Sequence, residues 1–148
     1  MALPDEDRTL IELIAKIGGA PPQGTGARFM ARRLKKDVHE VRLGTAQDPG
    51  ATLARAERLL AAQGRPLATD SAPDGTTAIR GVVGTGMGGL NPSVVTITVG
   101  PAAAGDGSTV LVRGAAKEGL IKQHGGRKGA EQIVTQWLTD DPTAAPAT

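Results

Sequence analysis

The stretch from Thr76 to Gln123 contains three short apolar segments separated by clusters of glycine. The clearest segment, 94–99, reads VVTITV and has the two-residue period of a β-strand. Residues 77–83 and 109–113 have the same character, and Gly, Pro and Asp occupy the turns around them. Consecutive strands with short connections favour antiparallel pairing. We therefore expect this stretch to form the centre of a sheet.

Other segments have apolar residues every three or four positions, which is the period of an amphipathic helix. The expected helices are 4–17, 27–36, 49–63 and 127–138, and the expected outer strands are 38–44 and 65–70. Phe29 and Trp137 are the aromatic residues of the whole chain, so its core is aliphatic and thin. A thin core suits two layers better than three.

We predict the α+β class, with a two-layer, mostly antiparallel sheet of four to five strands and helices packed on one face. A single α+β domain is expected at 27–139, preceded by an amphipathic helix within 1–19 and a Gly/Pro linker at 20–26. The tail, 140–148, has the composition of a disordered segment. The strand at 38–44 leads into a helix, a connection that is typical of parallel neighbours.

A glycine-rich loop separates the first two central strands. Gly84, Gly86 and Gly89 satisfy the spacing G-x-G-x-x-G, but a strand follows them where a dinucleotide site requires a helix. No Gly-Lys-Ser/Thr follows either, so this is not a P-loop. A long hairpin loop is the favoured interpretation, and a lid or an anion-binding loop is the alternative.

One basic cluster lies around the start of the last helix. It contains Lys117, Lys122, His124, Arg127 and Lys128. Cations are slightly unfavourable at a helix N-terminus, and the free backbone N–H groups there suit an anion. A bound phosphate or carboxylate would resolve this conflict, so we predict an anion-binding or partner-binding site. The alternative is an exposed loop with solvated charges.

A second basic patch contains Arg28, Arg32, Lys35 and Lys36, which helical winding would gather on one face. A solvated helix face is one interpretation, and contact with phosphates or an acidic partner is the other. Nucleic-acid binding would use the phosphate backbone, because the two aromatic residues cannot supply a row of stacking platforms.

The sequence argues against several chemistries. It has no cysteine, two histidines and none of the usual zinc-site or serine-hydrolase spacings. We expect no metal, no cofactor and no catalytic residue. The N-terminus lacks the apolar region of a signal peptide, and no apolar run is long enough for a membrane span. We therefore expect a cytoplasmic protein with no membrane partner.

The favoured function is a non-catalytic binding or interaction module that recognises an anionic ligand or acidic partner. The first alternative is a nucleic-acid-associated accessory factor that uses the basic surface residues. The second is a small enzyme acting on a phosphorylated or carboxylated substrate near Lys117, Lys122 and His124. A homo-oligomer through the N-terminal helix is a further prediction, since that helix could pack on its own domain or on a second copy.

Overall fold

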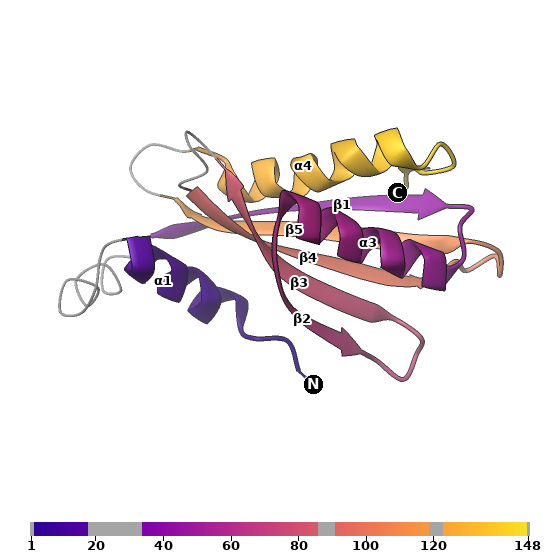
Figure 1. The fold of residues 1–148 in the computed structure, drawn as a ribbon, viewed down its shortest axis with the longest axis horizontal. Coiled ribbons are helices and arrows are strands. Elements are labelled where there is room, and N and C mark those ends of the chain that lie inside the picture. The colour runs from indigo at the N-terminus through magenta and orange to yellow at the C-terminus, as the bar shows by residue number, and fades with distance from the viewer. Residues whose placement is uncertain (1, 18–33, 86–90, 119–122, 148) are drawn as a thin grey trace.

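The computed structural model describes residues 2–17, 34–85, 91–118 and 123–147. Within these ranges it has an antiparallel sheet in the order β2-β3-β4-β5-β1-β6, together with helices α1, α3 and α4 (Figure 1). The strands are β1 (Lys35–Thr45), β2 (Gly64–Ser71), β3 (Thr77–Thr85), β4 (Asn91–Pro101), β5 (Ser108–Glu118) and β6 (Ala145–Pro146). The helices are α1 (Glu6–Ile17), α3 (Pro49–Gln63) and α4 (Gly125–Asp140). The predicted α+β class with an antiparallel sheet is confirmed.

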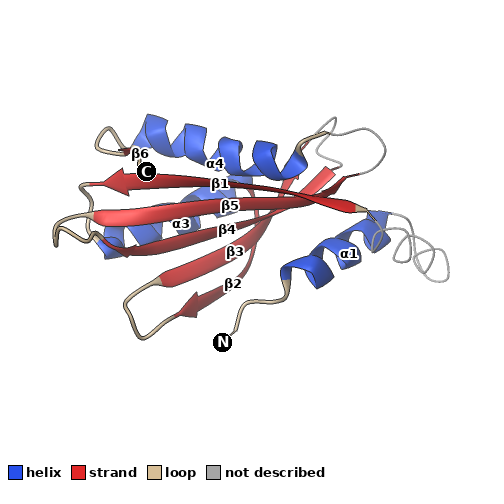
Figure 2. Ribbon diagram, turned by 180° about the vertical axis from the view of Figure 1, so that it is seen from behind, coloured by secondary structure: helices blue, strands red, loops and turns tan. Residues whose placement is uncertain are grey.

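The two faces of the sheet carry different helices. Strand alternation puts Val95 and Ile97 in the main core with Trp137 of α4 and Leu60 of α3. On the other face, Val94 and Ala115 pack against Leu10 of α1. Figure 1 shows α3 in front of the sheet, and Figure 2, from behind, shows α1 on the near side. The two core helices thus share one face and the N-terminal helix covers part of the other.

Capping residues set where the helices begin. Asp48 accepts a hydrogen bond from the Ala51 N–H at 2.9 Å, and Pro49 occupies the first turn of α3. At α1, the Asp5 side chain accepts from the Arg8 N–H at 2.8 Å. The first helix therefore starts at Glu6, two residues later than the sequence pattern predicted, because Asp5 provides the cap.

The expectation of a parallel neighbour for the first strand is wrong. β1 pairs antiparallel with β5 along its whole length, from Lys35 opposite Glu118 to Thr45 opposite Ser108. The helix that follows β1 leads to β2 at the far edge of the sheet. β1 and β2 run in the same direction, as is usual for strands joined through a helix, but β3, β4 and β5 lie between them, so the parallel strand is not a neighbour of β1.

The helix expected at 27–36 is wrong for its last two residues, which the structure describes as part of a strand. Lys35 and Lys36 belong to β1, while 27–33 lie outside the described residues. Pairing with β5 extends β1 toward the N-terminus, because Lys35 and Lys36 lie opposite Glu118 and Lys117. Long-range pairing here overrides the local helical pattern.

The tail that we expected to be disordered is ordered through Ala147. Asp141 is buried and accepts a hydrogen bond from Thr45 Oγ1 at 2.5 Å. Ala145 and Pro146 form β6 against β1, and the Ala147 N–H donates to the Arg42 carbonyl at 2.8 Å. Composition alone missed these specific polar contacts. No helix within the described ranges has the length and apolar character needed to cross a membrane.

Candidate functional site

The predicted anion site at the start of α4 is filled by the chain's own carboxylates. The Glu118 side chain accepts from the Gly125 N–H at 2.8 Å and from the Gln123 N–H at 3.2 Å. Asp37 accepts from the Arg127 N–H at 3.1 Å. The conflict seen in the sequence is real, but intramolecular negative charge resolves it at this helix terminus.

The cluster that prompted that prediction is spread over different surfaces. Lys117 lies on the sheet face that α1 covers, because it is two residues from Ala115 along β5. Arg127 forms an exposed ion pair with Glu131 at 2.8 Å. Lys128 lines a polar hollow of about 440 Å³ beside α3 and α4. His124 is exposed with a left-handed φ of 54°, and Lys122 lies outside the described residues.

The described residues of the second predicted patch, Lys35 and Lys36, do not lie on one surface. Lys36 Nζ pairs with Glu6 Oε1 at 2.5 Å and with Asp7 Oδ1 at 2.9 Å. Lys35 is the preceding residue of the same strand, so its side chain points to the opposite face. Arg28 and Arg32 lie outside the described residues.

Charge and apolar contacts together hold α1 on the sheet. Glu6 is 9% exposed and is paired with both Arg113 of β5 and Lys36 of β1. Burial raises the pKa of Glu6, but hydrogen bonds and charge from Arg113 and Lys36 outweigh it and leave the pKa below its usual 4.5. Arg113 also pairs with Glu40 at 3.0 Å. The position of α1 is therefore fixed at its N-terminal end.

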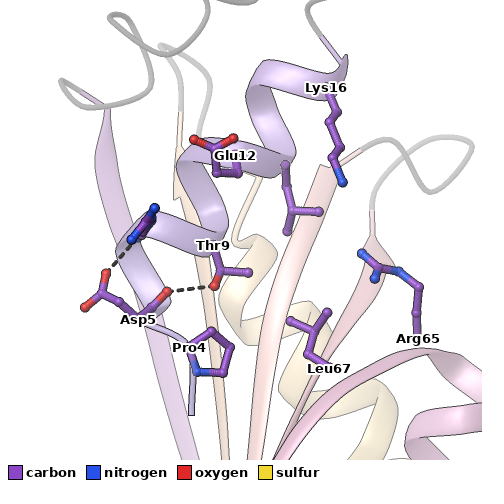
Figure 3. A pocket seen from close by; sticks show the side chains of 9 residues that line it. Pro4, Asp5, Thr9, Glu12, Lys16, Arg65 and Leu67 are labelled. Carbon is purple, nitrogen blue, oxygen red and sulfur yellow. Dashed lines mark hydrogen bonds between the residues drawn. The ribbon is translucent and has the colours of Figure 1, made fainter. Parts of the chain in front are cut away.

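An open groove runs between α1 and β2. It has a volume of about 390 Å³, within the range of small-molecule sites (Figure 3). Arg65 of β2 lies opposite Val82, and Val82 lies opposite Val94, which packs on Leu10. Residues directly opposite in a ladder share a face, so Arg65 projects on the side of the sheet that carries α1.

Apolar side chains line the middle of this groove. Leu13 comes from α1 and Leu67 from β2, while Pro4 lies at the N-terminal end. The register of β2 shifts between Pro66 and Ala68, which leaves Leu67 out of the ladder with β3. Arg80 holds this end in place, because its Nη1 donates to the Pro4 carbonyl and its Nε donates to Thr96 Oγ1 at 2.8 Å.

Cations from two elements face the groove. Lys16 comes from the last turn of α1, Arg8 from its first half and Arg65 from β2. Figure 3 shows the charged ends of Lys16 and Arg65 directed toward the same opening. None of these three side chains forms an ion pair with another residue that the structure describes. The convergence of Lys16 and Arg65 is the main electrostatic feature of the groove.

Two acidic residues also line the groove. Asp5 caps α1, and its backbone carbonyl accepts from Thr9 Oγ1 at 2.7 Å (Figure 3). Glu12 belongs to the middle of the helix and makes a contact of its own. The described residues of the lining include three cations and two carboxylates, which give a formal charge of +1 (3 − 2). The positive charge is concentrated where Lys16 and Arg65 meet.

The sequence did not identify this groove. The α1 residues of its lining recur at the spacing of one helix face, which gives one detectable signal; they are Arg8, Thr9, Glu12, Leu13 and Lys16. This spacing indicates one face of the helix but does not predict which strand packs opposite that face. The other wall comes from a strand far along the chain, and its key apolar residue, Leu67, stands at an irregularity in strand pairing.

Comparison with known proteins gives distant structural likenesses. No protein-family model and no curated protein matches the chain. A crystal structure of the Mll3558 protein from Rhizobium loti is similar, with 13% identity, a TM-score of 0.36, and 72% of this chain and 97% of that chain covered. The Ran-binding protein Mog1p of Saccharomyces cerevisiae has 11% identity and a TM-score of 0.37 over 75% of this chain and 67% of that chain. At these scores neither likeness bears on what this chain binds.

Proposed function

We propose that the protein is a non-catalytic binding module that recognises an anionic ligand or acidic partner in the groove between α1 and β2. The observation that carries this proposal is the convergence of Lys16 and Arg65 on one opening, where neither side chain forms an ion pair with a described residue. Like charges that converge repel one another, and a bound anion removes that repulsion. Such a local conflict is enriched at functional sites.

The lining suits recognition more than chemistry. Small-molecule sites combine mostly apolar walls with a few polar groups that orient the ligand. Here Leu13 and Leu67 supply the apolar walls and the two cations supply the orienting charge. Thr9 is the hydroxyl in the lining, and it donates its hydrogen bond to the Asp5 carbonyl. It has no histidine beside it to act as a general base.

The other predicted surfaces have less support. Binding of nucleic acid through the second patch would need Lys36, which is already engaged by Glu6 and Asp7. A homo-oligomer through α1 remains a prediction. Leu10 is the most buried residue of the apolar stripe of α1 and packs on the sheet of its own chain. A second copy would therefore contact only the part of α1 that this packing leaves exposed.

The test is a titration of isotope-labelled protein followed by NMR. The probes are decanoate, kept below its micelle concentration, and a hexaglutamate peptide. We expect shifts in the amide resonances of 8–16 and of Gly64, Arg65, Leu67 and Ala68 with at least one probe, at millimolar or lower concentration. Shifts confined to the α4 surface, or none with either probe, would contradict the proposal.

A further inference from the structure

We infer that the ligand of this groove is a monocarboxylate with a linear apolar tail. This inference rests on the proposed function and names the class of ligand. The reason is that one end of the groove carries Lys16 and Arg65, whereas its middle is lined by the apolar side chains of Leu13 and Leu67.

The head of the ligand would lie between Lys16 and Arg65. A guanidinium presents paired N–H donors that match the two oxygens of a carboxylate, and an ammonium adds a point charge. The two side chains come from different elements and are directed toward the same opening (Figure 3). Neither has an ion-pair partner among the described residues, so a carboxylate there would displace no ion pair within that part of the chain.

The tail would extend from this end over Leu13 and Leu67 toward Pro4. Helical rise is about 1.5 Å per residue, so the axial distance from Lys16 to Thr9 is roughly 10 Å. That length accommodates several methylene groups. Each buried methylene should raise affinity by up to about fourfold, which makes binding depend strongly on chain length.

The far end of the groove has one cation, Arg8, beside the carboxylate of Asp5, in place of the cation pair at the other end. Asp5 lies there with its carboxylate at the helix cap, and Glu12 lines the wall between the two ends. A dicarboxylate or a densely charged peptide would bring its remaining charge toward Asp5 and Glu12, with Arg8 as the single cation beside them. A single anionic head with an uncharged tail avoids that repulsion.

The test is isothermal titration calorimetry of the full chain with acetate, hexanoate and decanoate, and with decyltrimethylammonium as the cation of matched tail. We expect affinity to rise from acetate to decanoate by at least about tenfold and the cation to bind at least about tenfold more weakly than decanoate. The variant Arg65→Gln should weaken decanoate binding about tenfold or more. The control Arg58→Gln removes an exposed arginine of α3, outside the groove, and should leave it unchanged.

The tail contact has its own variant. Leu13→Ala should reduce the gain from hexanoate to decanoate while acetate binding stays the same. Equal affinity for all three carboxylates, or equal binding of decanoate and the cation, would overturn the ligand class and leave the proposed function standing if binding still needs Arg65. Hexaglutamate binding that needs Arg65, without decanoate binding, would also overturn the ligand class alone. Failure of every anion to bind would overturn both.

Discussion

Two hydrogen bonds join Arg113 of β5 to Glu6 of α1, from Nε to Oε2 at 3.0 Å and from Nη2 to Oε1 at 3.1 Å. This bidentate contact fixes the first turn of α1 over the centre of the sheet. The rest of the helix then extends beside β2, and Lys16 comes to face Arg65. The ion pair at one end of α1 thus contributes to the shape of the groove at the other.

Replacing Arg113 with Gln should lower the free energy of unfolding by about 1–3 kcal/mol, because the buried carboxylate of Glu6 keeps only Lys36 as a strong partner. Urea denaturation followed by the fluorescence of the fully buried Trp137 measures this. The matched control is Arg127→Gln, which breaks an exposed pair and should lower the free energy of unfolding by clearly less than Arg113→Gln does. Equal losses in the two variants would contradict this role of Arg113.

Stability should fall in acid, and Glu6 should account for part of the fall. Its folded pKa lies below the usual 4.5, so its contribution is present above that value and is lost as the pH falls through the folded pKa. Asp141 should also stabilise the fold less as the pH falls, because hydrogen bonds from Thr45 and Thr143 outweigh burial and lower its pKa from 3.8. The difference in unfolding free energy between wild type and Glu6→Gln should narrow as the pH falls below about 4.5. A constant difference between pH 7 and pH 3 would show that this carboxylate does not contribute in the expected way.

The start of α4 approaches the sheet so closely that it requires glycine. A Cβ on Gly114 would lie 2.0 Å from the Gly126 carbonyl oxygen and 2.9 Å from the Ala130 nitrogen, both backbone atoms. Gly114→Ala should therefore cost about 1–3 kcal/mol, measured by thermal or urea unfolding. Gly44→Ala is the matched control, since a Cβ there meets nothing within 4 Å, and it should be neutral or slightly stabilising. A Gly114→Ala variant as stable as the control would contradict the close approach.

Removing the carboxylate that caps α4 should destabilise the protein. Glu118→Ala leaves the buried Gly125 N–H without its acceptor, at a cost of about 0.5–2 kcal/mol. The same variant should gain stability from added phosphate, because its vacant N–H groups become available to an anion. Wild type should gain less, since Glu118 already occupies that position. A larger phosphate effect on wild type than on the variant would contradict this description of the helix terminus.

Local patterns in the sequence predicted the regular elements well. Alternation identified the strand around Val95 and Ile97, and Asp48 with Pro49 marked the start of α3 as observed. Pairing across long distances was harder to foresee. Lys36 was assigned to a helix from its neighbours, whereas its partner Lys117, eighty-one positions later (117 − 36), places it in a strand.

The candidate site depended even more on long-range structure. The sequence pattern indicated the charge conflict at the start of α4 but not how it is resolved, because Glu118 reaches that helix terminus only through the end of β5 beside it. The groove joins Lys16 to Arg65, and no local pattern relates two residues on different elements. Its apolar wall includes Leu67, which is exposed to the groove by a shift in strand register that composition does not reveal.

The most direct test of the account is the affinity of decanoate and of hexaglutamate for the double variant Lys16→Glu/Arg65→Glu, measured by calorimetry beside wild type. Trp137 fluorescence establishes that the variant is folded. We predict that wild type binds at least one of the two anions and that the double variant loses this binding by at least about a hundredfold, because two attractive charges become repulsive. Unchanged anion binding by the folded double variant would contradict the assignment of the groove between α1 and β2 as the binding site.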